Sequence, residues 1–312
     1  MVITDEIREA CAWVAGRAKN VRVADDAVAT YTESLGLGAS TATAGEIKTL
    51  KDRAEREAAA AFWLTLDAIN FGSGWFPTLR KRSEPTGYRT IAAGVRRRFE
   101  QQGPWTASDL AQIATGDLAV VLGQDPDHEL LALFAVSLRD LGAQLSTGYA
   151  GSFTAVIDEV RGSAVGLVTR LASWECFADV SAYLGRDVPF LKRAQIVAAD
   201  LHRAGAAQFG DLPELTLFAD NLVPHVLRLD GVLEFDSALV DRIERGELIE
   251  HGSAEEVEIR ACAVHAVELM VAAAREAGVA ATSAQLDELL WSRGQGTDYK
   301  SVPRHRSRTT AY

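Results

Sequence analysis

The chain has 312 residues, of which 48% are hydrophobic and 24% charged, and its formal net charge is −11. A chain of this length and composition can bury a core of its own, which excludes disorder throughout. An acidic chain repels phosphate backbones, so we expect no general nucleic-acid binding. The longest apolar stretch, residues 58–66, is far shorter than the ~20 residues that cross a bilayer. With no signal-peptide pattern at the N-terminus, we expect a cytoplasmic protein without membrane contact.

Cysteine and histidine usage argues against metal and cofactor chemistry. Cys11, Cys176 and Cys262 are far apart and form no CxxC pair, so we expect three buried thiols in a reducing compartment. The six histidines are scattered. The sequence contains no glycine-rich dinucleotide fingerprint, no Walker A motif and no HExxH motif. It therefore predicts neither a metal site nor a cofactor.

Helical periodicity dominates the first half of the chain. Thr43–Glu46 is a capping-box pattern that opens a predicted amphipathic helix reaching Ile69. Two glycines and a proline within residues 67–77 end that helix in a loop that carries three aromatic rings. Residues 130–145 form a broad apolar stripe typical of another helix. Only residues 118–122 suggest a strand in this half.

The second half is predicted to be helical as well. Pro189 fits the first turn of a helix that runs to His202. Asp236 and the capping-box residues Ser253 and Thr282 each open a further helix, and the one from Ser253 runs to Ala277. Residues 231–235 suggest a short strand. Since no linker or repeat divides the chain, we expect one all-α domain over residues 1–312 with at most minor strands.

Basic residues gather in two places. Residues 80–98 contain seven basic side chains and one acidic one, and residues 293–312 contain five basic and one acidic, plus His305. Two such clusters on an acidic chain can converge on an anionic ligand. The alternative is two solvated faces, with a frayed end to the chain.

Three segments place ionisable groups among apolar residues: 190–201, 215–224 and 255–265. They make Asp220 and Glu258 candidate carboxylates of a functional site, with Lys192 as a candidate basic partner. Each has a structural alternative. Lys192 can extend its charge from a core helix to water, Asp220 can cap a helix that starts near Asn221, and Glu256–Arg260 in the third segment can be a surface pair. The residues alone predict a Lys–Asp site without naming its substrate.

An ordered set of short segments is more specific than any of them alone. The segments are Asp67–Pro77, Gly87–Tyr88, Gly151–Phe153, Phe190–Asp200, Leu217–Asp220, Val223–Pro224, Glu256–Arg260 and Val302–Arg306. Together they resemble the queuosine salvage protein family, the queuosine 5′-phosphate N-glycosylases. The resemblance implies an architecture similar to that of helix-hairpin-helix DNA glycosylases, in agreement with the all-α prediction.

The resemblance also implies a reaction: hydrolysis of queuosine 5′-monophosphate to free queuine and ribose 5-phosphate, for queuine salvage into tRNA modification. Asp220 matches the family's catalytic aspartate in the Phe-Ala-Asp motif. A carboxylate there stabilises the positive charge that builds on the sugar as the base leaves. Lys192 would favour the charged form of that carboxylate, or contact the sugar or base.

Base recognition is expected from the region of the first loop. Phe71 and Tyr88 can stack on a purine-like plane, and Asn70 can read its guanine-like edge. Queuine also carries a secondary amine and a diol, so an acidic side chain is expected nearby. Glu258 is the candidate, and a structural role for Glu258 is the alternative.

The basic C-terminal segment suits the 5′-phosphate. His305, Arg306 and Tyr312 are the candidate phosphate ligands, with Arg308 and Lys300 as further ones. The expected partner is therefore a small-molecule nucleotide, with no obligate protein partner and no direct nucleic-acid binding.

Two other functions remain open. A DNA or RNA base glycosylase keeps the fold and changes the substrate, but the net charge and the absence of a broad basic face oppose it. The second is a non-enzymatic α-helical binding module, in which Asp220 is only a helix cap.

Overall fold

Residues 2–37, 49–81 and 86–312 are described by the computed structural model. α-Helices dominate these residues, and the strands form two short antiparallel pairs. The predicted all-α fold with minor strands is therefore confirmed. None of the described helices is both long and apolar enough to cross a bilayer.

The chain forms two compact units, each built from stretches that are distant in sequence. The first unit comprises Met1–Glu46, Asp179–Lys192 and Pro213–Arg308, and the second comprises Ile47–Ala178, Arg193–Leu212 and Thr309–Tyr312. One domain over residues 1–312, with the architecture of helix-hairpin-helix glycosylases, stays a prediction.

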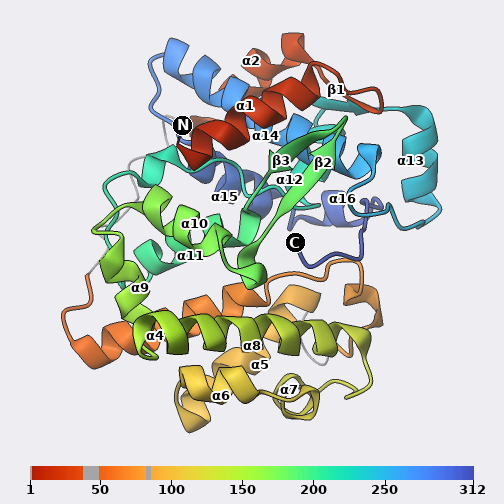
Figure 1. Cartoon of the computed structure of the whole chain (residues 1–312). Helices are drawn as coiled ribbons and strands as arrows, with labels where there is room; N and C mark the ends of the chain where they lie inside the picture. The colour runs from red at the N-terminus through yellow and green to blue at the C-terminus, as the bar shows by residue number, and fades with distance from the viewer. Residues whose placement is uncertain (1, 38–48, 82–85) are drawn as a thin grey trace. The chain divides into compact units, whose positions relative to one another are not determined.

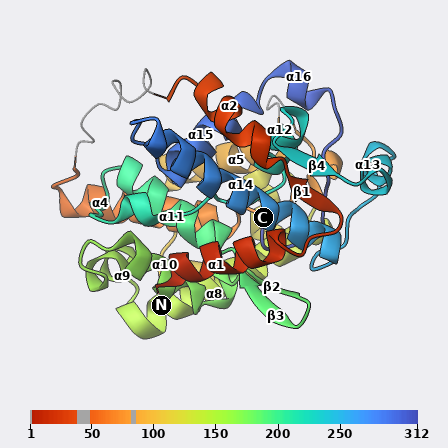
Figure 2. The same cartoon turned by 90° about the horizontal axis from the view of Figure 1, so that it is seen from above.

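The first unit is organised around its longest helix, α14 (Figure 1). Its elements are α1 (Ile3–Ala15), β1 (Val21–Val23), α2 (Asp25–Ser34), β2 (Val180–Tyr183), β3 (Arg186–Pro189), α12 (Val223–Leu229), β4 (Leu233–Phe235), α13 (Ser237–Glu244), α14 (Ala254–Glu276), α15 (Ser283–Arg293) and α16 (Thr297–Lys300). α1 packs on α14 (Figure 2). The buried residues Ile7, Cys11 and Val14 of α1 recur at helical spacing along one face. β1 pairs with β4, Val21 opposite Phe235, so residues far apart in sequence share one core.

The second unit contains the rest of the helices, and α8 is its longest. Its elements are α4 (Arg53–Ala68), η2 (Phe76–Thr78), α5 (Gly87–Gln102), α6 (Ala107–Gln112), α7 (Thr115–Leu122), α8 (Glu129–Tyr149), α9 (Phe153–Glu159), α10 (Ala164–Ala172) and η3 (Glu175–Phe177). α11 (Lys192–Arg203) and η4 (Leu212–Glu214) contain the points where the chain passes from one unit to the other. α6 packs closely on α8, where Gly142 lies against the α6 backbone.

The strand predictions had mixed success. The strand expected at residues 231–235 is confirmed as β4. The strand expected at 118–122 is wrong, because these residues form the end of α7. Asp117 accepts a hydrogen bond from the N–H of Ala114 and so starts a helix, and the short apolar run alone does not distinguish the two structures. The β2–β3 hairpin was missed, and its turn is Leu184–Gly185, both at positive φ.

Of the predicted helix starts, one is corrected and another falls outside the described residues. The capping-box residues 43–46 lie outside the described residues, and α4 begins only at Arg53. Asp52 caps the N-terminus of α4 by accepting the N–H of Glu55 at 2.9 Å, and this cap fixes the start of the helix at Arg53. Pro189 does not open a helix but ends β3, because it pairs with Val180 in the hairpin. The caps at Asp236, Ser253 and Thr282 are confirmed.

Candidate functional site

Asp220 lies just before α12, where backbone amides point at its half-buried carboxylate. Oδ1 accepts the N–H of Leu222 at 2.7 Å and that of Val223 at 3.3 Å. The capping interpretation is corrected, because the cap residue of α12 is Leu222 and Asp220 instead fixes the turn that leads into the helix. Within the described part of the first unit, no hydrogen bond reaches the second oxygen, Oδ2. The carboxylate is therefore held at one oxygen while the other is available for chemistry.

A second carboxylate, Asp287 of α15, is buried close to the first. Its Oδ1 accepts the N–H of Phe218, two residues before Asp220, at 3.2 Å. Burial raises the pKa of Asp287 well above its ordinary value, the negative charge of Asp220 raises it further, and the positive charge of Lys192 opposes both. Within the first unit, Asp220 and Lys192 thus act with opposite effects on the pKa of this buried carboxyl group.

The C-terminal segment also reaches Asp220. Arg304 is half-buried, burial lowers its pKa, and the charge of Asp220 counteracts that shift. The next residue, His305, is buried, and burial lowers the pKa of its imidazole to about 3. Asn221 donates its side-chain N–H to the His305 carbonyl at 3.1 Å. Arg306 donates to the carbonyl of Gly246 at 3.1 Å.

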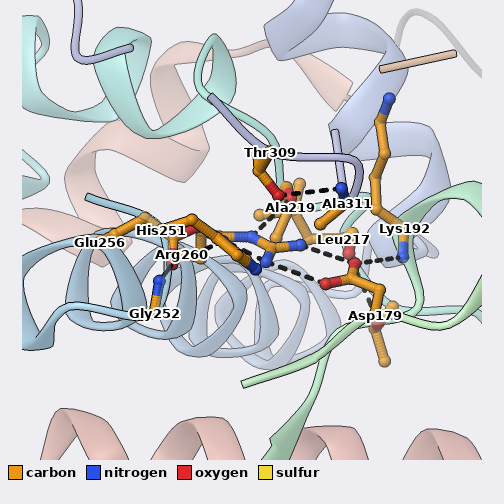
Figure 3. A network of polar contacts seen from close by, with 11 residues as sticks. Asp179, Lys192, Leu217, Ala219, His251, Gly252, Glu256, Arg260, Thr309 and Ala311 are labelled. Atoms are coloured by element: carbon orange, nitrogen blue, oxygen red, sulfur yellow. Dashed lines mark hydrogen bonds and ion pairs between the residues drawn. The ribbon is translucent and has the colours of Figure 1, made fainter. Parts of the chain in front are cut away.

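A buried ion pair lies behind both candidate catalytic residues (Figure 3). Arg260 of α14 donates Nη1 and Nη2 to the two oxygens of Asp179, at 3.0 and 2.7 Å. Its Nε donates to the carbonyl of Ala219 at 3.1 Å. Asp179 also accepts the backbone N–H of Lys192 at 3.1 Å. One ion pair thus contacts the main chain at or beside both Lys192 and Asp220.

Glu256 extends this pair by one helical turn. Its Oε1 lies 3.6 Å from Nη1 of Arg260, and both side chains are fully buried. The predicted ion pair is confirmed, but its interpretation as a surface pair is wrong. Burial opposes ionisation, yet the hydrogen bond from His251 and the charge of Arg260 hold the pKa of Glu256 at about 2. Glu256 is thus a charged partner inside the core.

Glu258 is engaged by the protein itself. Its Oε2 accepts the backbone N–H groups of Lys19, Asn20 and Val21 at 3.0, 2.6 and 3.2 Å. Its Oε1 accepts the hydroxyl of Tyr183 at 2.8 Å. Four donors on a buried carboxylate favour the structural alternative, in which Glu258 fixes the start of β1.

The second unit holds the predicted base-binding residues. Asn70 donates to the buried Asp67 at 3.4 Å. Burial raises the pKa of Tyr88 and the charge of Asp67 raises it further, so Asn70 and Tyr88 flank the same carboxylate. Phe71 is fully buried, and the centroid of its ring lies 5.0 Å from that of Phe134. The guanidinium carbon of Arg193 lies 5.0 Å from the centroid of the Phe71 ring.

The C-terminal residue joins this loop. Gly72 donates its N–H to the carbonyl of the buried Tyr312 at 2.9 Å. Gly72 has φ +102°, and a Cβ there would lie 2.6 Å from a methyl of Leu130, so only glycine fits the turn. The structure therefore brings Tyr312 next to Phe71 in the second unit, while Arg306 and His305 lie in the first.

Residues 50–312 match the sequence model of the queuosine salvage protein, well over half of the chain. The chain belongs to the queuosine salvage protein family. It is similar to proteins named queuosine 5′-phosphate N-glycosylase/hydrolase. That of Sphaerobacter thermophilus is 41% identical over 266 residues, 82% of each chain, and those of Nematostella vectensis and Bos taurus are 29% and 28% identical over 98% of each chain. The resemblance seen in the sequence is confirmed.

The matched region contains every candidate site residue, together with some that the sequence did not single out. Asp287 could have been found, because an acid three residues before the buried Leu290 stands on the apolar face of its helix. Arg304 lies in the quoted Val302–Arg306 segment, where Arg306 was favoured. Asp179 carried no signal, since its partner Arg260 is far away in sequence.

No group of three or more histidine, cysteine or acidic side chains within residues 2–37, 49–81 and 86–312 is arranged to hold a metal ion. Cys11, Cys176 and Cys262 are free and buried, as expected from the sequence. Burial raises the pKa of each thiol, so all three stay protonated.

Proposed function

We propose that this protein hydrolyses the N-glycosidic bond of queuosine 5′-monophosphate, releasing queuine and ribose 5-phosphate for salvage into tRNA modification. Membership of the queuosine salvage family supports this, with relatives named queuosine 5′-phosphate N-glycosylase/hydrolase at up to 41% identity. The substrate is a small molecule, and water supplies the oxygen that replaces the base at C1′.

Asp220 is the proposed catalytic carboxylate, and its hydrogen bonds are the observation that carries this assignment. The amides of Leu222 and Val223 fix Oδ1, so Oδ2 keeps a defined position without a protein donor in the described part of its unit. An anionic oxygen held below C1′ stabilises the cationic sugar as the base departs, and it costs no rearrangement during the reaction.

The surrounding charges suit this role. Lys192 supplies a positive charge that acts on Asp287, and Arg304 supplies one that interacts with Asp220. Burial and the charge of Asp220 both raise the pKa of Asp287, which favours its neutral form beside the anionic Asp220. We propose that Lys192 acts with Asp220 in catalysis.

Base and phosphate recognition are assigned to two groups of residues. Asn70, Phe71 and Tyr88 are proposed for the base, and the full burial of Phe71 favours a packing role over direct stacking on the base. His305, Arg306 and Tyr312 are proposed for the phosphate. Because burial lowers the pKa of His305 to about 3, its imidazole is neutral, and arginine must supply the positive charge.

We leave Glu258 out of the binding proposal, because four protein donors already occupy its oxygens. Reduced, buried thiols support action in the cytoplasm. The rival functions make different predictions. A base glycosylase would release bases from oligonucleotides as fast as from the mononucleotide, and a binding module would release none.

The assignment is tested by incubating the protein with queuosine 5′-monophosphate and detecting free queuine by mass spectrometry. Asp220→Asn keeps the size of the side chain and an acceptor for the two amides but removes the charge. We expect kcat to fall by about 10³-fold, in the range seen when a transition-state partner is lost, with substrate binding retained.

The matched control is Asp236→Asn. Asp236 also accepts a backbone N–H at a helix start, that of Ala238 at 2.9 Å, but it caps α13, which contains no candidate site residue. We expect its kcat to equal that of the unchanged protein. Near-normal hydrolysis by Asp220→Asn would refute the catalytic assignment, and release of no queuine by the unchanged protein would refute the function.

A further inference from the structure

We propose that the buried Asp179–Arg260 pair is a positioning device that fixes Asp220 and Lys192 relative to each other, so that its integrity sets the rate of glycosidic cleavage. This inference rests on the proposed function. Both side chains are fully buried and joined by two hydrogen bonds. Neither is proposed to touch the substrate.

On one side, the pair holds the main chain that leads into Asp220. Arg260 Nε donates to the carbonyl of Ala219, the residue just before it. Ala219 in turn donates its N–H to the carbonyl of Leu217 at 3.0 Å, which closes a tight turn. Since the carboxylate of Asp220 is itself tied to the start of α12, the residue is fixed both through its side chain and through the peptide before it.

On the other side, Asp179 collects three successive backbone N–H groups. Its carbonyl accepts those of Phe190 at 3.0 Å and Leu191 at 3.3 Å, and its carboxylate accepts that of Lys192 at 3.1 Å. In Figure 3 the Lys192 side chain extends away from Asp179, whose carboxylate accepts the main-chain N–H of Lys192. Asp179 therefore sets the direction in which the lysine leaves the backbone.

The backbone is strained at this point. Leu191 has φ +51°, in the left-handed region that costs a leucine free energy. Such conformations persist where the surrounding contacts over-determine them, and they concentrate at functional sites. Here the contacts are the three hydrogen bonds to Asp179, which hold the strained residue immediately before Lys192.

The chemistry of the Asp179–Arg260 pair favours a role in positioning its neighbours over a role in stabilising the fold. Burying two charges costs desolvation energy, and well-packed apolar side chains often serve stability equally well. The Arg260 guanidinium adds contacts that only its shape allows. Its Cζ lies 3.9 Å from the centroid of the Phe190 ring while its fork reaches Asp179 and Ala219 together. A lysine cannot make these contacts at once.

The test compares Arg260→Lys and Asp179→Asn with the unchanged protein, using queuosine 5′-monophosphate and measuring kcat and KM on folded protein. A misplacement of about 1 Å in a catalytic group can cost about 10²-fold in rate. We expect kcat to fall by about that factor in each variant, with KM changed less than about threefold. The double variant should lose no more than either single one, because the pair acts as a unit.

Arg8→Lys is the matched control. Arg8 also pairs with a carboxylate of α14, Glu268 at 3.0 Å, and donates to a backbone carbonyl, that of Glu214 at 2.8 Å. We expect Arg8→Lys to lower Tm without changing kcat. If Arg260→Lys and Asp179→Asn also lower Tm but keep kcat, the pair is merely structural and the proposal is wrong. If the unchanged protein releases no queuine, the proposed function fails and this inference fails with it.

Discussion

The two oxygens of Asp220 have different surroundings, and this difference explains why the sequence supported two interpretations of one residue. Oδ1 accepts two amides in the turn before α12, whose cap residue is Leu222. Oδ2 is the oxygen proposed for chemistry. A structural role and a catalytic role for one carboxylate are therefore compatible, because the two amide bonds supply the rigidity that the chemistry requires.

Asp287→Asn is expected to raise Tm by a few degrees at neutral pH. Burial, reinforced by Asp220, raises the pKa of Asp287 well above its ordinary value, so the native state keeps a proton that the unfolded chain releases above pH ~4. Stability contributed by this group is therefore lost as pH rises from about 4 toward the folded-state pKa. Asparagine removes that cost while it can still accept the N–H of Phe218.

The measurement is thermal unfolding of both proteins at pH 7.5 and pH 4. The stabilisation by Asp287→Asn should be present at pH 7.5 and shrink at pH 4, where the wild-type carboxyl is partly protonated in the unfolded chain as well. An equal Tm difference at the two pH values would contradict a raised pKa. Activity of the variant, measured alongside, reports whether the proton on Asp287 also matters for catalysis.

At the scale of elements, periodicity predicted helices well and short elements poorly. The apolar stripe at residues 130–145 lies within α8, and the caps at Ser253 and Thr282 begin α14 and α15. Residues 118–122 failed because five apolar residues fit a buried helix turn as well as a strand. β1 could not be predicted from its three residues, because its stability comes from pairing with β4 more than 200 residues away.

Helix α8 contains two glycines with opposite expected responses to alanine. A Cβ on Gly142 would lie 2.3 Å from the backbone N of Ala111 and 2.5 Å from the carbonyl of Ala107, so α6 must move. We expect Gly142→Ala to lower the free energy of unfolding by about 1–3 kcal/mol. Gly148 faces open space, so Gly148→Ala should stabilise by up to about 1 kcal/mol through helix propensity.

Urea unfolding of both variants gives the free energies of unfolding. Each variant serves as the control for the other, since the substitution and the helix are the same and only the neighbours differ. A destabilisation of similar size in both would mean that α6 does not pack against Gly142 as the structure shows.

At the scale of the whole molecule, the sequence identified the family and predicted a lysine–aspartate site, but it did not predict the residues that long-range folding brings close to Lys192 and Asp220. Asp220, Asp287 and Arg304 come from separate segments of the first unit and interact through charge. No local period encodes that proximity. The basic clusters at residues 80–98 and 293–312 fall mainly in different units, so their convergence on one anion stays a prediction.

Acid should destabilise the whole molecule through its buried histidines. Burial lowers the pKa of His305 to about 3 and that of His225 to about 4. In the unfolded chain these two histidines become protonated near pH 6.5, whereas in the native state they stay neutral until much lower pH. The free energy of unfolding therefore falls as pH drops from about 6.5 toward the folded-state pKa values. His305→Gln should remove the part of this destabilisation that His305 contributes, which is about 3 kcal/mol at most between pH 7.5 and pH 4.5. Urea unfolding of both proteins at pH 7.5 and pH 4.5 measures this difference in the free energy of unfolding. An unchanged pH dependence in the variant would mean that His305 takes up its proton in the folded state as readily as in the unfolded chain.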